Sequence, residues 1–592
     1  MKKVSFLTDY ELLSKLFFRL LPFQVMLLVI NTLNSIVDTL FASNFIGKTA
    51  MSALGLYAPM NHLLFAMSIV LVSGSQLMMG EALGRNQKDQ VKKLFSVDVS
   101  FAIRLSVITA VLVEVAVLTN ATSVLVNTQE ELSAFNSYLL GQSVGIPALV
   151  LGQQLFAFLS MENQTRRTMI ASLCCIVANT TMNFVFVVIF RMGTFGLGLG
   201  SSIGLWFFCM VMAVHYLSGK SELRFTLGAF NLADAKSIFV RGYPGAISRF
   251  LEMFRCVIVN ALILEFVGAV GLSSFAASNS VMGLFWPIPF GMCAVLRMIL
   301  GITIGEEDRK SMKDIMKIFL TRGLMLQCLV TIFIIVMAKP FTMMFYRDPS
   351  DPVFDMTVKA FLLLPLCMPL AVISLGMTGY AQAARLKKLS IVLPIVDGAV
   401  GVVACSIILI PRFEMTGLYI ANILNGVLCL IVILVFCIIN CGHFPKNMEE
   451  FLMIPDSFGA SENERIDIEI RDMKGVLEIS GRVIDFCSER GIDHRRSCFA
   501  GLALEEMAGN VVEHGFEPGK NGNYIDIRVV HKDDDVILRI RDNCRSFDPL
   551  KRTEIHKEND VTKNVGIRLA VGIAKKVNYQ NLLGLNVTTI RI

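Results

Sequence analysis

Four polar side chains near the N-terminus fall on one face of a strongly apolar segment. Asn31, Asn34, Ser35 and Asp38 are spaced so that an α-helix places all four on the same side. A carboxylate on such a stripe can carry a proton or bind a sodium ion, and ionisable groups at membrane depth rarely serve packing alone. We therefore predict that Asp38 and Asn34 bind an ion or a substrate, with a helix–helix hydrogen bond as the structural alternative.

Two later apolar segments carry polar groups of the same kind. Asn179 and Asn183 stand one helical turn apart and could face one cavity, although packing between helices would explain them equally well. Glu252 shares a helix face with two arginines. It could bind an ion or a substrate, or it could only neutralise those arginines, because buried charges must be paired.

A third group lies in the polar C-terminal region. Glu506, Asn510 and His514 recur every four residues and share one face of an expected helix. A carboxylate and an amide one turn apart can hold water and a magnesium ion against a phosphate chain. A capped surface helix would give the same spacing, so the pattern alone is weak.

Composition predicts the elements that must position these groups. Of 592 residues, 54% are hydrophobic and only 17% are charged, whereas soluble proteins have about 25% charged residues. These values exclude an ordinary soluble enzyme and predict a polytopic membrane protein. The net charge of +6 does not indicate nucleic-acid binding, because the basic residues lie in short loops. The 14 cysteines show neither zinc-site nor disulfide spacing.

Twelve apolar runs are each close to the ~20 residues that cross a bilayer. The predicted spans are 17–44, 53–82, 94–119, 132–159, 168–190, 196–218, 242–267, 273–300, 316–338, 356–383, 389–410 and 415–440. Alternate loops hold most of the Lys and Arg, so the positive-inside rule places these loops and both termini in the cytoplasm. The N-terminal segment lacks a signal-peptide cleavage site, so the first run is expected to remain as a membrane helix.

The membrane part repeats itself at an offset of 221 residues, which superimposes Gly80 on Gly301 and Gly84 on Gly305. One offset that holds across five helices predicts two parallel six-helix halves, residues 1–220 and 221–440. Secondary transporters use this plan with a central site between the halves. After a linker at 441–459, the dense charge of residues 460–592 predicts a separate domain, with the element order helix, helix, strand, strand, loop, helix, strand.

Residues 10–440 resemble the multidrug and toxic compound extrusion (MATE) family. The resemblance rests on VDTLFASNFIGKTAMSALGLYAPM, SQLMMGEALGRNQKD, NTTMNFVF and GYPGAISRFLE. It implies an efflux antiporter driven by protons or sodium ions. Asp38 then matches the first-helix acid, Asn179 and Asn183 match polar positions of the fifth helix, and Glu252 matches the seventh-helix glutamate of the NorM branch. The tenth helix, LCMPLAVISLGMTGY, lacks that branch's acid, so the coupling ion stays open.

The C-terminal domain resembles the GHKL-type ATPase fold, especially the anti-sigma-factor serine kinases. The resemblance rests on Glu506 and Asn510, a strand ending at Asp542, and the helix VGIRLAVGIAKKV. It implies bound ATP and magnesium, with Glu506 as general base, Asn510 as magnesium ligand, Asp542 as acceptor of the adenine amine, and Gly566 at a phosphate-binding helix start. In DNCRS, Cys544 and Ser546 replace two expected glycines and would crowd the nucleotide.

These features predict an ion-coupled antiporter of the cell membrane that exports amphipathic organic compounds and is regulated by a cytoplasmic nucleotide-binding domain. One alternative is a membrane-anchored signalling protein whose kinase-like tail acts on a small protein partner, and another is a flippase for lipid-linked cargo. ATP is not expected to drive transport directly, because the chain has no G-x4-G-K-[ST] loop and only one such tail.

Overall fold

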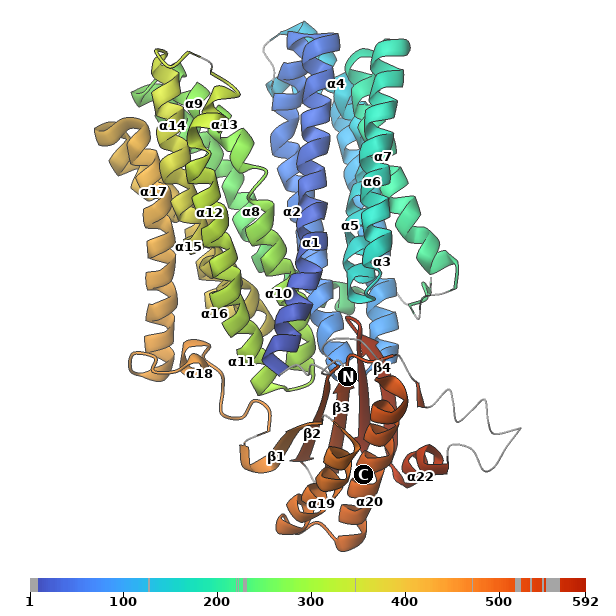
Figure 1. The fold of residues 1–592 in the computed structure, drawn as a ribbon. Helices are drawn as coiled ribbons and strands as arrows, with labels where there is room; N and C mark the ends of the chain where they lie inside the picture. Colours follow the sequence, from blue (N-terminus) through green and yellow to red (C-terminus); the bar gives the residue numbers. More distant parts are fainter. Residues whose placement is uncertain are drawn as a thin grey trace, which may run out of the picture.

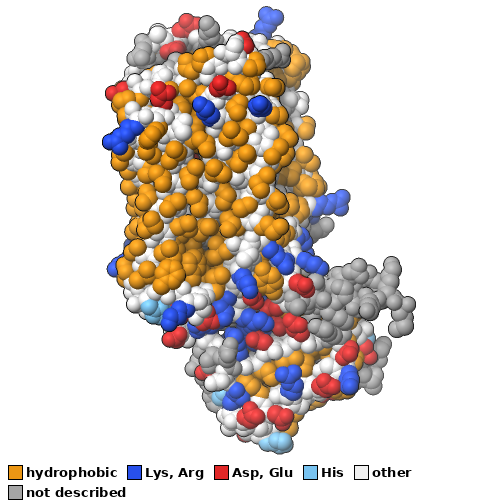
Figure 2. All heavy atoms as spheres, turned by 60° about the vertical axis from the view of Figure 1, so that its left-hand side comes forward, with side chains coloured by type: hydrophobic (Ala, Val, Ile, Leu, Met, Phe, Trp, Pro, Cys, Tyr) orange, Lys and Arg blue, Asp and Glu red, His pale blue; other side chains and the backbone are white. Residues whose placement is uncertain are grey.

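The computed structural model describes residues 9–125, 128–219, 221, 223–226, 231–346, 348–460, 462–470, 472–516, 523–532, 535–545, 548–549 and 565–592. These residues form two helical bundles side by side and a smaller α/β domain, the tail domain, at one end of both (Figure 1). We call this end of the bundles the docking end. Hydrophobic side chains cover the flank of the bundles in Figure 2, as expected for a surface that contacts lipid.

The first bundle contains long helices whose charged residues lie mainly near their ends. Helices α4 and α5 are bent by 43° at a short break and together make one crossing. Its elements are α1 (Asp9–Phe41), α2 (Lys48–Gly84), α3 (Lys88–Leu118), α4 (Gln129–Ser143), α5 (Ile146–Met161), α6 (Thr165–Asn183) with a π-helical turn (Phe184–Ile189), and α7 (Gly193–Leu217).

The second bundle repeats this plan. Its elements are α8 (Leu232–Phe266), α9 (Ala269–Met282), α10 (Pro287–Gly305), α11 (Arg309–Ile318) with a π-helical turn (Phe319–Gly323), α12 (Leu324–Val336), α13 (Ala338–Met343), α14 (Pro352–Leu363), α15 (Cys367–Ala383), α16 (Lys387–Ile395) with a π-helical turn (Val396–Val400), and α17 (Gly401–Cys441). Inside α17 the backbone turns at Glu414, where φ is 51° and ψ is −135°.

The number of membrane crossings agrees with the predicted twelve. Nine helices in the described residues are long and apolar enough to cross a membrane, and the bent α4–α5 pair adds one more. The 55 residues of Lys387–Cys441 would be about 80 Å long as one helix, so the turn at Glu414 divides them into two crossings. Helix α8 provides the twelfth crossing. Helices α1 and α8 begin before the predicted spans, at Asp9 and Leu232, because both helices continue beyond their apolar segments.

Glycines allow the two bundles to touch backbone to backbone near the docking end. A Cβ atom added to Gly80 would lie 2.9 Å from the Cα atom of Gly301, and one added to Gly242 would lie 1.7 Å from the carbonyl oxygen of Val70. Gly80 and Gly301 are the residues that the 221-residue offset relates. Equivalent glycines therefore meet across an approximate twofold axis, as parallel repeats require.

The tail domain is a five-stranded antiparallel sheet in the order β1-β2-β3-β5-β4. Its helices cover one face, over a core that includes Ile527, Leu538 and Ile540, and the other face meets the bundles (Figure 1). Its elements are β1 (Arg465–Glu469), α19 (Met473–Glu489), α20 (His494–Asn510) with a π-helical turn (Val511–Gly515), β2 (Ile525–Lys532), β3 (Asp535–Asp542), α22 (Val565–Ile573), β4 (Lys576–Leu582) and β5 (Leu585–Arg591).

The predicted element order of the tail domain was wrong at both ends. Strand β1 was missed, because its alternating charges (RIDIE) resemble a solvated segment. The single final strand is in fact the β4–β5 hairpin. Its two-residue turn, Leu583–Gly584, has φ values of 53° and 85°, but it lacks the Asn-Gly or Asp-Gly pair that usually marks such a turn in a sequence.

Candidate functional site

Asp38 lies in the first bundle among three neutral hydrogen-bond donors from two other helices. The side-chain amides of Asn179 and Asn183 donate to its Oδ1 at 3.3 and 2.8 Å, and the hydroxyl of Ser201 donates to its Oδ2 at 2.7 Å. Asp38 is 7% exposed and belongs to no ion pair among the described residues. The carboxylate is therefore held by dipoles alone, an arrangement that leaves room for a proton or a metal cation as its counter-charge.

Two glycines of α7 bring these donors together. A Cβ atom on Gly200 would lie 2.2 Å from Oδ1 of Asn183, and one on Gly204 would lie 2.9 Å from Cβ of Asn179. Helix α7 thus packs closely against α6 and aims Ser201 at Asp38. Ser201 was missed by the sequence analysis, although the small-residue run GLGLGSS indicates such a close helix contact.

A cavity of 370 Å³ opens beside Asp38. Asn34 and Ser35 line it, as the predicted polar stripe requires, together with the rings of Tyr57 and Tyr138. Asn34 donates to the sulfur of Cys175 at 3.4 Å, and its own Oδ1 is buried without a hydrogen-bond partner among the described residues. The side chain of Asn31 is outside the described part of the chain. The cavity therefore combines one acid, free amide oxygen and aromatic walls.

Glu252 lies in a different electrostatic setting, in a 470 Å³ cavity of the second bundle. Its two oxygens accept from Arg249 at 3.1 Å and from Arg255 at 3.0 Å. The guanidinium of Arg249 also stacks 3.7 Å from the ring centre of Phe290. Of the two alternatives for Glu252, the geometry therefore matches the partner of the arginines.

Asp397 is the second acid of this cavity. It accepts from Ser374 at 3.0 Å and from Asn425 at 3.0 Å, while Arg255 donates to its backbone carbonyl at 3.4 Å. Neutral donors again hold the carboxylate, but here a guanidinium lies close by. Asp397 is therefore the natural comparison for Asp38.

A third cavity, of 410 Å³, lies in the tail domain between α20 and the helix-covered face of the sheet. It brings together Asn510, His514 and Asp542 and adds Asn586. Asp542 accepts from the amide of Asn586 at 2.8 Å and from the backbone N–H of Cys544 at 2.9 Å. Asn586 was missed, because nothing in the sequence indicates that the last hairpin reaches this cavity.

Glu506 and Gly566 meet each other beside this cavity and not in its lining. A Cβ atom on Gly566 would lie 1.6 Å from Oε2 of Glu506, so only glycine permits this contact. No group of three His, Cys, Asp or Glu residues suits a metal ion in the described part of the chain. A magnesium ion fits here only as a companion of phosphate, with the amide oxygen of Asn510 as a protein ligand. Ser546 lies outside the described residues.

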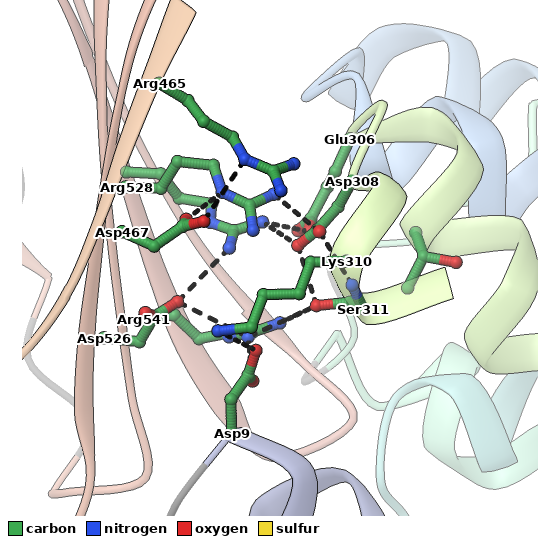
Figure 3. A network of polar contacts seen from close by, with 12 residues as sticks. Asp9, Glu306, Asp308, Lys310, Ser311, Arg465, Asp467, Asp526, Arg528 and Arg541 are labelled. Atoms are coloured by element: carbon green, nitrogen blue, oxygen red, sulfur yellow. Dashed lines mark hydrogen bonds and ion pairs between the residues drawn. The ribbon is translucent and has the colours of Figure 1, made fainter. Parts of the chain in front are cut away.

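The outer face of the sheet forms a buried ionic network with the second bundle (Figure 3). Asp308, in the α10–α11 turn, binds Arg528 at 2.6 Å and Arg539 at 2.8 Å, and Arg539 also binds Glu306 at 2.7 Å. Burial would raise the pKa of the Asp308 carboxyl, but the guanidinium groups of Arg528, Arg539 and Arg541 hold it well below its usual value. Asp308 therefore stays ionised, and in these contacts two acids face two arginines.

The same face also holds the first bundle. Asp9, at the start of α1, binds Arg541 and accepts from the hydroxyl of Tyr524 at 3.1 Å. Gln580 donates to the carbonyl of Leu83 at the end of α2, at 2.8 Å. The tail domain therefore bridges both bundles at the docking end. The predicted linker takes part as well, since Glu449 in α18 (Met448–Phe451) binds Arg309 at 2.6 Å.

The sequence analysis did not identify these docking residues. Arg539 and Arg541 alternate with core residues along β3, a pattern that also describes a solvent-facing strand. Only the fold shows that this face is covered.

Comparison with known protein families identifies the membrane part. The MatE family model matches residues 24–185 and 244–406, more than half of the chain and one match in each bundle. The chain belongs to the MatE family. A histidine kinase-like ATPase domain matches residues 478–592, so the tail domain of this MATE protein is of that type.

Curated relatives and solved structures agree with this assignment. A probable multidrug resistance protein NorM from Neisseria meningitidis is 24% identical over 385 residues, covering 63% of this chain and 82% of the relative. One from Listeria innocua is 24% identical over 306 residues, 49% of this chain and 65% of the relative. An outward-facing MATE transporter of the MOP superfamily superimposes with a TM-score of 0.65 at 18% identity, covering 72% of this chain and 96% of that one. The protein is therefore a multi-pass membrane transporter with the MATE fold.

Proposed function

We propose that this MATE protein exports amphipathic organic compounds in exchange for protons or sodium ions, with Asp38 as the coupling group. The observation that carries the proposal is the set of neutral donors around Asp38, which open into a cavity. Such a carboxylate can take up and release a cation without breaking an ion pair. The relatives named as probable multidrug resistance proteins support organic cargo, and the aromatic walls suit it.

The docking end is taken to face the cytoplasm. Arg85, Lys88, Lys310 and Lys313 gather there, in loops that the positive-inside rule keeps in the cytoplasm. The bundles touch through Gly80 and Gly301 at the same end. The transporter would then be closed to the cytoplasm.

We further propose that the tail domain regulates transport by its docking. Alternating access requires the two bundles to move apart at the cytoplasmic end and to close at the other. A domain bound to Asp9 of one bundle and to Asp308 of the other opposes that movement. Release or rearrangement of the tail domain would then accompany each inward-opening step.

Nucleotide binding is the expected control of this docking. ATP would lie in the 410 Å³ cavity, with Asp542 accepting from the adenine amine and Asn510 near the magnesium-bound phosphates. Bound ATP would supply the transferable phosphoryl group for any action on a protein partner, with Glu506 in the role of base. Asp542 and Arg541 are neighbours on opposite faces of β3, so a change at the nucleotide cavity has a short path to the docking network.

The test is flux of a fluorescent organic cation from proteoliposomes under an imposed proton or sodium gradient, with and without magnesium and ATP on the tail side. Coupling predicts that one gradient drives flux, and regulation predicts that nucleotide changes its rate in the intact protein but not in an Asp542→Asn variant. Flux that follows neither gradient would overturn the antiporter assignment.

A further inference from the structure

The outer face of the sheet does not seal completely against the bundles. A cavity of 1040 Å³ remains between them, larger than the cavities beside Asp38 or Glu252. Its membrane-side walls are the α2–α3 turn at Gly84–Lys92 and the α10–α11 turn at Gly305–Glu307. These turns are repeat equivalents, and both contain a non-glycine residue in the left-handed region, Asn86 and Glu307. The cavity therefore lies close to the axis that relates the two bundles.

Positive side chains dominate this cavity, and they come from both sides of the interface. Eight lysines and arginines line it, against four acids. Arg528 and Arg539 are already neutralised in the docking network. Lys88 and Lys92 of α3 and Lys576 of β4 have no ion-pair partner among the described residues. The transporter and the tail domain thus both contribute unpaired lysines to the cavity. In the docked state these positive charges surround the same cavity.

Two further features indicate which kind of ligand would fit this cavity. Helix α3 begins at Lys88, and its N-cap residue Gln87 makes no side-chain capping bond, so the first-turn N–H groups are available on this wall, although Asp89 in the same turn offsets part of their positive potential. The lining contains no aromatic side chain among the described residues. A planar base would therefore find no stacking partner here, whereas phosphate oxygens would find ammonium and amide donors.

We propose that this cavity binds a multiply charged phosphate anion that bridges α3 and β4 and so strengthens docking of the tail domain. The anion is either a free polyphosphate or the phosphorylated headgroup of a lipid. The site lies on the opposite face of the sheet from the nucleotide cavity. It builds on the proposed regulation by docking, but it does not depend on nucleotide binding at Asp542.

The experiment uses the intact protein in detergent with inorganic tripolyphosphate as the probe, followed by calorimetry. The Lys88→Gln/Lys92→Gln/Lys576→Gln variant is expected to bind at least tenfold more weakly than the parent. A Lys387→Gln/Lys388→Gln control, which removes exposed lysines outside the cavity, is expected to bind normally. If the triple variant folds poorly, the single Lys88→Gln and Lys576→Gln variants should each weaken binding about threefold to tenfold.

A second arm separates the two sources of phosphate. Vesicles with and without phosphatidic acid replace detergent, and protease cleavage near residues 456–461 reports release of the tail domain. Protection by tripolyphosphate assigns a free anion, and protection only by phosphatidic acid assigns a headgroup. Protection by neither probe, or equal loss of binding in the Lys387/Lys388 control, would overturn the proposal. An Asp542→Asn variant should still bind tripolyphosphate, so failure of the nucleotide proposal would be recognised separately.

Discussion

The two bundles share one repeated plan, yet Asp38 in the first and Glu252 in the second are held by opposite kinds of partner. In the first bundle, Asp38 accepts hydrogen bonds only from neutral amides and a hydroxyl. In the second, Glu252 is fixed between two guanidinium groups at 3.0 and 3.1 Å. The first acid has no counter-charge among the described residues, as the proposed exchange of a cation requires. The second is already neutralised and is suited to holding its helix surface together.

The internal repeat does not relate these two acids. The 221-residue offset places Asp38 opposite Val259 and Glu252 opposite Asn31. The two halves share the helical scaffold and the glycine pairs, while their charged groups occupy different positions. The contrast extends to the docking end, where Asp308 is held by arginines as Glu252 is. Mutation of an acid that is paired with arginine should therefore lower the stability of the protein. Mutation of Asp38 should instead reduce transport.

The largest structural effect is expected at the docking network. Asp308→Asn keeps the capping bond to the N–H of Ser311 but leaves Arg528 and Arg539 short of a charge. Removing one partner of a buried ion pair costs about 3–5 kcal/mol. We predict release of the tail domain, seen as faster protease cleavage near residues 456–461. An Asp485→Asn control removes an exposed acid of α19 that lies away from the docking face and should cleave like the parent; equal cleavage of both variants would contradict the account.

Glu252→Gln should destabilise the second bundle without uncoupling transport. The change weakens two charged hydrogen bonds, each worth about 1.5–3 kcal/mol, and leaves Arg249 and Arg255 uncompensated. Thermal unfolding should occur at a lower temperature, while the folded fraction still transports along the gradient. The control is Glu265→Gln, an exposed acid on the same helix. Normal stability with lost coupling would place Glu252 in the transport machinery instead.

Ser201→Ala should have a smaller and purely functional effect. It removes one donor at 2.7 Å from Asp38 and leaves the two asparagines in place. Efflux should slow about fivefold to tenfold, which corresponds to about 1–1.4 kcal/mol for one hydrogen bond. The neighbouring Ser202→Ala loses a bond to the carbonyl of Gly141 instead. If both variants slow efflux equally, helix packing and not the Asp38 site is responsible.

The contribution of Asp308 to docking of the tail domain should be almost independent of pH between about 5 and 8, where a normal carboxyl is already ionised. Its arginines lower the pKa of the Asp308 carboxyl in the folded protein. Asp308 therefore stabilises docking fully at any pH above the pKa that this carboxyl has in the unfolded chain. The contribution is lost only when the pH falls through the lowered pKa of the folded protein. Protease cleavage across this range checks the prediction. Release of the tail domain near pH 6 would mean that another group controls docking.

The membrane architecture could be predicted because each helix carries its own apolar run and because the repeat leaves matching glycines in both halves. Asp38, Asn179 and Asn183 were also recognisable, since polar residues stand out in an apolar helix. Ser201 could not be singled out, because its role depends on how closely α7 approaches α6. The docking arginines were hidden for a related reason: only the assembled fold distinguishes a covered sheet face from a solvated one.

The central claim is that Asp38 couples ion movement to export, and flux under an imposed gradient tests it most directly. Parent, Asp38→Asn and Asp397→Asn proteins are reconstituted at equal density, and efflux of a fluorescent organic cation is followed after a proton or sodium jump. Asp397 is the matched control, since it too accepts from neutral donors, but in the other cavity. We predict that Asp38→Asn reduces gradient-driven flux to background while Asp397→Asn retains most of it. Gradient-driven flux at the parent rate in Asp38→Asn would contradict the account.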